Sequence, residues 1–191
     1  MHSLATAISI GFPIVIAGLI HVAVIKLRLM PGLARIRLDG GLTFRGRTLF
    51  GENKTLRGAV TLIVATIAVV AIQVWATSGS AWATNLQPLF QQQHPLVWGA
   101  LLGTGYVLGE LPNSFVKRQL GIAPGETAHN SSRIVFWTVD QLDSIAGMFL
   151  LLLPVWTPTF AVIVALAGVT LIVHPAVAGI MYALGLKQRV G

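Results

Sequence analysis

The sequence predicts an all-α integral membrane protein, a single membrane domain over residues 1–191 with five transmembrane helices. The first observation is composition: 54% of the residues are hydrophobic and 10% are charged, whereas soluble domains carry about 25% charged residues. The second is a series of apolar runs of membrane-spanning length, and the third is a one-sided distribution of Lys and Arg. The chain has no cysteine, which excludes disulfides and thiolate metal sites.

Each apolar run is matched to the length of about 20 residues that a transmembrane helix needs. No cation precedes the first run, so it is interpreted as a permanent span and not as a secretory signal. The third is the shortest, and His174–Pro175 is expected to kink the fifth. The five expected spans are residues 3–25, 58–76, 96–111, 134–153 and 159–186, with loops at 26–57 and 112–133.

The basic residues set the expected orientation. All 13 Lys and Arg lie in loop 26–57, in loop 112–133 with its borders, or after residue 186. Five crossings place these three segments on one side, which the positive-inside rule makes cytoplasmic. We therefore expect a protein of the cytoplasmic membrane with its N-terminus outside and its C-terminus inside. Juxtamembrane cations beside anionic lipid account for the net charge of +7, so no nucleic-acid partner is expected.

The first candidate motif is Asp140-Gln141-Leu142-Asp143, inside the fourth apolar run. Residues three apart share a helix face, so both carboxylates can point at one object. A bound divalent cation would relieve their repulsion, and Mg²⁺ commonly takes one or two carboxylates plus substrate phosphates; Mn²⁺ is a possible substitute. The alternative is that the two acids pair with Arg or Lys and only hold helices together.

The second motif is Gly109–Arg118. On a continuous helix one face would carry an acid, a hydroxyl and two cations, namely Glu110, Ser114, Lys117 and Arg118. Pro112 is expected either to kink this helix or to start a new one. Both arrangements put phosphate-compatible groups at the cytoplasmic end of the third span. The alternative is an ordinary basic juxtamembrane flank.

The third motif is Phe44–Gly58, which enters the second span directly. Its glycines allow close approach of backbone to phosphate, but the order of residues is not that of a P-loop. The candidate phosphate-binding side chains are Arg45, Arg47, Asn53, Lys54, Thr55 and Arg57. The alternative is positive-inside charge with turn glycines.

Together the three motifs resemble the CDP-archaeol synthase family, membrane enzymes that transfer CMP from CTP to an isoprenoid ether-lipid phosphate. The resemblance is carried in order by Arg47–Gly58, Gly109–Arg118 and Asp140–Asp143 and covers essentially the whole chain. One position departs from the family pattern, because Glu110 stands where the family has Asp. That family is related to the phosphatidate cytidylyltransferases.

The resemblance implies a CTP-dependent cytidylyltransferase of phospholipid biosynthesis, with CTP and a membrane lipid phosphate of archaetidic or phosphatidic acid type as substrates. Its site would lie in the cytoplasmic loops, and pyrophosphate would be released. The implied catalytic residues are Asp140, Asp143, Lys117 and Arg118; the implied Mg²⁺ ligands are Asp140, Asp143 and Glu110; the implied substrate-binding residues are Asn53, Lys54, Thr55, Arg57, Ser114, Arg45 and Arg47.

Other functions are compatible with the same residues. A CTP-dependent polyprenol or phytol kinase would pass the γ-phosphate to a lipid alcohol and release CDP. A membrane transporter would use the buried acids as an ion site, and a structural membrane protein would leave the three motifs unexplained. Outside the motifs, His21 is expected to hydrogen-bond a neighbouring helix, and Gly103-Thr104-Gly105 is expected to allow close helix packing.

Overall fold

The computed structural model describes residues 2–80, 93–126 and 132–183. These residues form five long helices, a one-turn helix and a small hairpin, which are α1 (His2–Lys26), α2 (Pro31–Ala34), β1 (Thr43–Phe44), β2 (Arg47–Thr48), α3 (Leu56–Thr77), α5 (Pro95–Gln119), α6 (Ser132–Leu152) and α7 (Phe160–Ala183). The all-α prediction is confirmed.

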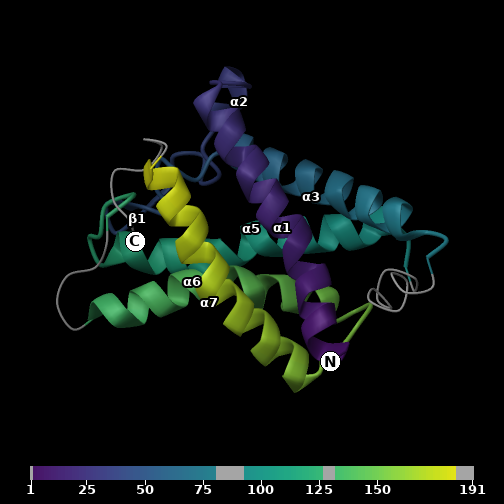
Figure 1. Ribbon diagram of the computed structural model, residues 1–191. Coiled ribbons are helices and arrows are strands. Elements are labelled where there is room, and N and C mark those ends of the chain that lie inside the picture. The colour runs from purple at the N-terminus through teal and green to yellow at the C-terminus, as the bar shows by residue number, and fades with distance from the viewer. Residues whose placement is uncertain (1, 81–92, 127–131, 184–191) are drawn as a thin grey trace.

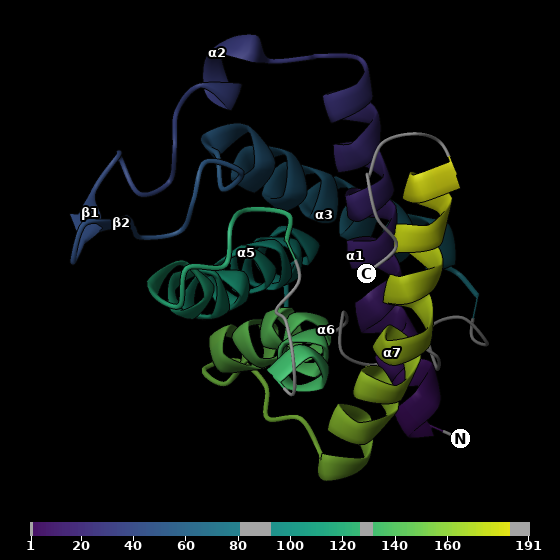
Figure 2. The same cartoon turned by 90° about the vertical axis from the view of Figure 1, so that its left-hand side faces the viewer.

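The long helices form two layers. In Figure 2, α5 lies between α3 and α6, and the helices α1 and α7 cover one flank of this group. The end of α1, the start of α3 and the end of α5 lie toward α2 and the hairpin (Figure 1). The described Lys and Arg residues of loop 26–57 and of the end of α5 therefore gather at one end of the bundle, whereas the basic segment after residue 186 lies outside the described residues.

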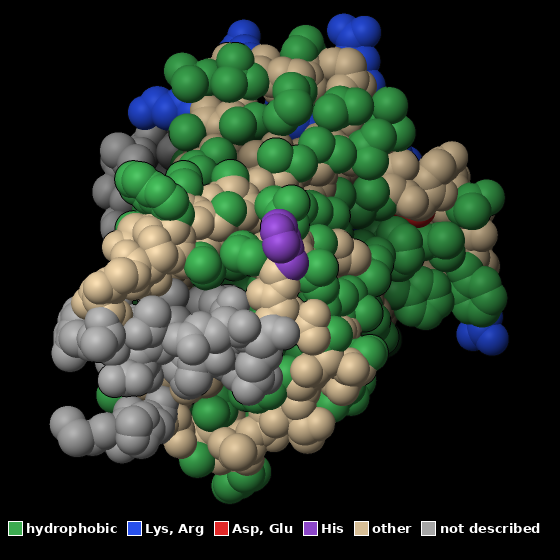
Figure 3. All heavy atoms as spheres, turned by 90° about the vertical axis from the view of Figure 1, so that its right-hand side faces the viewer, with side chains coloured by type: hydrophobic (Ala, Val, Ile, Leu, Met, Phe, Trp, Pro, Cys, Tyr) green, Lys and Arg blue, Asp and Glu red, His purple; other side chains and the backbone are tan. Residues whose placement is uncertain are grey.

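Four helices have the length and apolar composition to cross a membrane, and they cover Ser3–Lys26, Leu56–Thr77, Arg133–Leu152 and Phe160–Gly179. Their outer surface is correspondingly apolar: on the face in Figure 3, hydrophobic side chains dominate and Lys and Arg lie at its margins. These helices match the first, second, fourth and fifth expected spans. In the fifth, the helix continues through Pro175 to Ala183, and residues 184–186 lie outside the described part of the chain.

The third expected span differs most from the structure. Residues 96–111 belong to α5, but this helix continues to Gln119 with Pro112 inside it. The expected boundary at Pro112 is therefore wrong, and residues 112–119 are helix and not loop. Proline removes one backbone donor, yet packing against both neighbours holds the helix on either side of it. Because of this continuation, the polar residues of the second motif stand on a rigid helix.

Glycines let α5 approach both neighbours closely. A Cβ atom on Gly99 or Gly103 would lie 2.5 Å or 2.8 Å from the Cα atoms of Ile67 or Ile63 in α3. On the side toward α6, a Cβ on Gly109 would lie 2.4 Å from the carbonyl oxygen of Asp143. Small residues at such crossings are the usual route to tight packing of membrane helices, and this confirms the expectation for Gly103.

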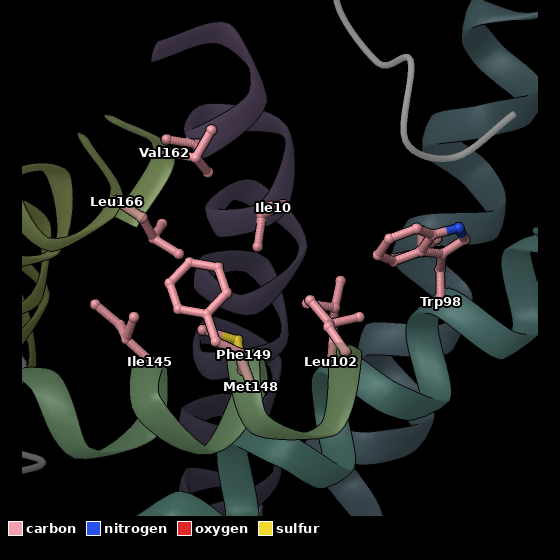
Figure 4. Close-up of a cluster of buried hydrophobic side chains, with 11 residues drawn as sticks. Ile10, Trp98, Leu102, Ile145, Met148, Phe149, Val162 and Leu166 are labelled. Carbon is pink, nitrogen blue, oxygen red and sulfur yellow. The ribbon is translucent and has the colours of Figure 1, made fainter. Parts of the chain in front are cut away.

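The hydrophobic core lies where the two layers meet. Figure 4 shows Ile10 of α1 and Leu166 of α7 pointing at Phe149 of α6, with Met148 beside them. Leu102 adds a contribution from α5. All five side chains are buried. This cluster fixes α1 and α7 against α6, the helix that carries the two aspartates.

Candidate active site

The two aspartates of the first motif face α5 and share a hydrogen-bond donor. Nδ2 of Asn113 donates to Asp140 Oδ1 at 2.5 Å and to Asp143 Oδ2 at 2.8 Å. Asp143 Oδ1 accepts a further bond from the backbone N–H of Ser144 at 2.6 Å. The prediction that both carboxylates share one face is confirmed, and their separation is set by a single amide group on the neighbouring helix.

Cations from two segments reach the acids of the site. Lys117, one turn after Asn113 on α5, forms an ion pair with Asp140 and lies 2.5 Å from its Oδ2. Lys54, from the segment before α3, forms an ion pair with Glu110 on α5. These two pairs connect the third motif to the second and the second to the first. Residues separated by 86 positions in the sequence therefore form one charged cluster.

Arg118 follows Lys117 on α5 but takes no part in the two ion pairs of this cluster. Its side chain is buried, with 8% of the residue exposed, and its Nε and Nη1 atoms have no hydrogen-bond partner among the described residues. It lies against Gly51, where a Cβ would be 3.3 Å from Arg118 Cδ. Buried guanidinium nitrogens without a hydrogen-bond acceptor are unfavourable, so an anion beside Nε and Nη1 of Arg118 would be favoured.

Gly51 makes this approach possible because its φ of +96° lies in the left-handed region. The segment after it forms a turn in which Lys54 N–H donates to the Gly51 carbonyl at 3.2 Å. This turn directs Lys54 toward α5. Arg57 follows in the first turn of α3, and its Nε is also buried without a partner among the described residues.

The segment before this turn is held by Asp39. Arg37 donates to both oxygens of Asp39, at 2.9 Å and 2.8 Å, and the backbone N–H groups of Gly41 and Phe50 add two more bonds. Burial alone would raise the pKa of Asp39, but these hydrogen bonds outweigh it and lower the pKa to about 2. Asp39 therefore stays ionised and fixes the loop that carries the third motif.

Three residues of the third motif lie elsewhere than expected or have a structural partner. Arg45 stacks over the ring of Phe44 at 5.3 Å in the hairpin turn, and Arg47 donates to the carbonyl oxygen of Gln119 at the end of α5. Neither contacts the carboxylates, so their expected place in the site is not supported by the geometry. Thr55 caps α3 by accepting from the N–H of Gly58 at 3.4 Å. Asn53 is exposed on the turn before α3.

The polar face of α5 is also different from the predicted one. The residues that meet α6 and Lys54 are Glu110, Asn113 and Lys117, and not the predicted set that included Ser114 and Arg118. Ser114 is buried on α5 and makes no described contact with the carboxylates. Helical spacing permits either face, because both lie three to four residues apart. Asn113 belongs to the second motif, but nothing in the sequence indicates its role. Its hydrogen bonds to the two aspartates depend on the position of α6.

The donor set fits a magnesium site completed by substrate. No group of three or more His, Asp or Glu side chains in residues 2–80, 93–126 and 132–183 is clustered closely enough to hold a metal. Two adjacent carboxylates are present, however, and the side chain of Asp140 is 37% exposed. Mg²⁺ keeps several waters and is usually bound by one or two carboxylates together with phosphate oxygens.

Comparison with protein families identifies a match over residues 13–190, to the CarS-like family of CDP-archaeol synthases. That match covers all three motifs. Among curated proteins, the chain is similar to the CDP-archaeol synthase of Methanoculleus marisnigri, with 37% identity over 158 residues, 79% of this chain and 87% of the relative. The synthase of Methanospirillum hungatei is 35% identical over 149 residues, 75% of this chain and 81% of the relative.

A solved structure has a similar fold. It is described as "Structural insight into an intramembrane enzyme for archaeal membrane lipids biosynthesis", and it matches with a TM-score of 0.64 and 26% identity. The match covers 90% of this chain and 91% of the other. The helical architecture is thus one that a membrane-embedded enzyme uses.

Proposed function

Because this chain belongs to the CarS-like CDP-archaeol synthase family, we propose that the charged cluster at the end of α5 and α6 is its cytidylyltransferase site. The protein is a CTP-dependent nucleotidyltransferase of the membrane that makes a CDP-activated lipid from a lipid phosphate. The observation that supports this site is the joining of all three motifs by two ion pairs and one shared amide.

The reaction joins two phosphates. An oxygen of the lipid phosphate attacks the α-phosphorus of CTP and forms a new P–O bond, while the bond from that phosphorus to the bridging oxygen breaks and pyrophosphate leaves with the electron pair. A phosphate monoester is already ionised near neutral pH, so the chain does not have to supply a strong base. Its tasks are to position both phosphates and to neutralise their charge.

The cations of the site suit the triphosphate. Arg118 and Arg57 have buried guanidinium atoms without partners among the described residues, and guanidinium groups bind phosphate oxygens with two parallel hydrogen bonds. Lys54 and Lys117 lie beside carboxylates, which hold their ammonium groups in place for further phosphate contacts. Asn53 and Ser114 remain proposed donors to the substrate, whereas Thr55 serves the site by starting α3.

Asp140 and Asp143 are the proposed Mg²⁺ ligands, with Glu110 as a further candidate. Bound there, the metal would neutralise charge on the triphosphate and on the departing pyrophosphate. Asn113 holds both carboxylates in register through its amide, and such outer-shell hydrogen bonds orient metal ligands. Glu110 forms an ion pair with Lys54. The carboxylate, which the extra methylene places farther from the backbone than in Asp, therefore has a partner in the loop before α3.

The proposed site also implies an orientation. Lys54, Arg57, Lys117 and Arg118 all lie at the basic end of the bundle, which the positive-inside rule places in the cytoplasm. CTP is a cytoplasmic substrate, so the same end must face the cytoplasm for the reaction. We propose an N-terminus outside and a C-terminus inside the cytoplasmic membrane.

The test is a product assay with the purified protein, CTP, Mg²⁺ and archaetidic or phosphatidic acid. We expect CDP-lipid and pyrophosphate; a CTP-dependent lipid kinase would instead release CDP. Asp143→Asn removes a proposed metal ligand, which should lower kcat/KM by about 100-fold or more, since charge stabilisation of this kind amounts to several kcal/mol. Glu52→Gln, which changes an exposed acid that takes no part in the two ion pairs, is the control. Wild-type turnover by Asp143→Asn would contradict the assignment.

A further inference from the structure

A cavity of about 310 Å³ lies between α1, α6 and α7, with α5 closing one side. Most of its lining is aliphatic, and Ile145, Met148 and Leu166 belong both to this lining and to the core cluster of Figure 4. A water molecule occupies about 30 Å³ of liquid and a methylene group is of similar size, so the cavity has room for roughly ten carbon atoms.

The cavity is elongated along α1. Its lining on that helix extends from Gly11 to Val22, and at 1.5 Å per residue this corresponds to about 16 Å. The lining on α7 extends over a similar length, from Leu166 to Ala178. A Cβ on Gly11 would lie 3.2 Å from Leu166 Cδ1, so the two helices are in contact where the lining starts. A volume of about 310 Å³ drawn out over this length suits a linear hydrocarbon chain.

The polar part of the lining adjoins the candidate active site. Glu110, the partner of Lys54, and Ser144, the residue after Asp143, both line the cavity. His21 lies beside the first turn of α3, where a Cβ on Gly58 would be 3.4 Å from its Cε1. The apolar space therefore reaches Glu110, whose ion-pair partner Lys54 is proposed to bind phosphate.

Two buried polar atoms in this lining lack partners among the described residues. They are Nδ1 of His21 and Oε1 of Gln141, and only 8% of Gln141 is exposed. The expectation that His21 hydrogen-bonds a neighbouring helix is not met at this atom. Unsatisfied buried polar atoms are unfavourable, so both atoms indicate a ligand with polar groups at this end.

We propose that this cavity binds one hydrocarbon chain of the lipid phosphate substrate, with His21 and Gln141 contacting the polar linkage between the chain and the phosphate. The proposal rests on the function proposed above and names the place of its lipid substrate. The phosphate then lies toward Arg57 and Lys54, beyond the end of the cavity that Glu110 lines, and the chain lies toward Gly11 in the apolar interior. A cytosine base at the Gly11 end of the cavity would leave its polar edge unpaired among aliphatic side chains, which is unfavourable.

The decisive experiment fills the cavity. Gly18 lines it, and a Cβ there has no neighbour within 4 Å, so Gly18→Leu adds bulk without displacing the backbone. Gly168→Leu is the matched control, since Gly168 also has open space at Cβ and does not line the cavity. With long-chain phosphatidic or archaetidic acid, we expect the KM for lipid to rise about tenfold or more in Gly18→Leu, with the KM for CTP unchanged.

A wild-type KM for lipid in Gly18→Leu, or a raised KM for CTP in its place, would overturn the proposal. Retained CTP binding by the variant separates loss of the lipid site from loss of the fold. His21→Leu should raise the KM for lipid in the same way. His21→Gln should raise this KM less, because only that substitution keeps a polar group.

Photo-crosslinking provides a second measurement that does not depend on turnover. A lipid phosphate with a diazirine in its chain should label α1 and α7 around Gly11 and Leu166 in the wild type and much less in Gly18→Leu. Equal labelling by a phosphatidylcholine probe would mean that an ordinary bilayer lipid occupies the cavity, and the proposal would be wrong. If the wild type makes no CDP-lipid yet is labelled specifically by lipid phosphate, the proposed reaction fails and the lipid site stands.

Discussion

At the scale of single residues, one amide organises the site. Asn113 donates from its Nδ2 to two different aspartates. Two like charges this close repel, and a shared donor holds them together without adding a charge of its own. Lys117 then partly neutralises Asp140. The position of both carboxylates therefore depends on α5 as much as on α6.

Removing that amide should weaken metal use. We expect Asn113→Ala to raise the Mg²⁺ concentration needed for half-maximal activity by about 10–100-fold, the usual effect of losing an outer-shell hydrogen bond. The measurement is CDP-lipid formation across a Mg²⁺ titration. Gln73→Ala is a matched control, because Gln73 is an amide on α3 that donates to the backbone of Ser9 at 3.3 Å. An unchanged Mg²⁺ dependence would speak against the orienting role.

Asp39 holds the loop that carries the third motif, and its contribution to the stability of the folded protein should depend on pH. Its pKa in the folded protein is about 2, below the ordinary 3.8, so the folded state favours the ionised form. The resulting stabilisation of the folded state is fully present above the unfolded-state pKa and is lost as the pH falls through the folded-state pKa.

We therefore expect Asp39→Asn to lower the thermal midpoint in detergent at neutral pH, with the difference from the wild type shrinking between about pH 4 and pH 2. Glu52→Gln, which changes an exposed acid of the same loop, should leave the midpoint near the wild-type value. A difference that persists unchanged at the acid end of this range would show that the charge of Asp39 is not what stabilises the loop.

At the scale of elements, α5 determines the geometry because it has two glycine faces. Gly99 and Gly103 pack on α3, while Gly105 and Gly109 pack on α6. The site residues Glu110, Asn113 and Lys117 follow directly after these glycines on the same helix. Close packing in the apolar part of α5 therefore sets the distance between its polar part and the aspartates.

This coupling can be tested at Gly147 of α6. A Cβ there would lie 2.2 Å from the carbonyl oxygen of Gly105 and 2.4 Å from the Cα of Gly109, so Gly147→Ala must push α5 and α6 apart. We expect a destabilisation of about 1–3 kcal/mol, seen as a lower thermal midpoint, together with a loss of activity. Gly168→Ala, at an open position, should preserve both.

At the scale of the whole molecule, charge and hydrophobicity are separated along the helices. The two-layer bundle presents apolar side chains outward (Figure 3) and collects its cationic motifs at one end. The cavity beside α1 and α7 connects the apolar interior to that end. This arrangement suits an enzyme whose nucleotide comes from water and whose lipid comes from the bilayer.

The orientation is directly testable because the chain has no cysteine. Thr157→Cys, between α6 and α7, should react with a membrane-impermeant maleimide applied to intact cells. Glu126→Cys, after α5, should react only once the membrane is permeabilised. The reverse pattern would place the basic end outside and would contradict the proposed orientation.

Composition and local sequence patterns are enough to identify the membrane class, the approximate spans and the three motifs. These follow from local properties: a run of apolar residues needs no partner to be recognised as a span, and Asp140 and Asp143 share a face wherever their helix lies. The family resemblance came from the same motifs in order.

How the three motifs meet depends on the packing of the helices and loops. The continuation of α5 past Pro112, the choice of Asn113 over Ser114, and the positions of Arg45 and Arg47 away from the carboxylates depend on how the segments pack. The same is true of the buried Arg118. Helical periodicity fixes which residues of one helix share a face, but which face becomes the site depends on where the neighbouring helices pack.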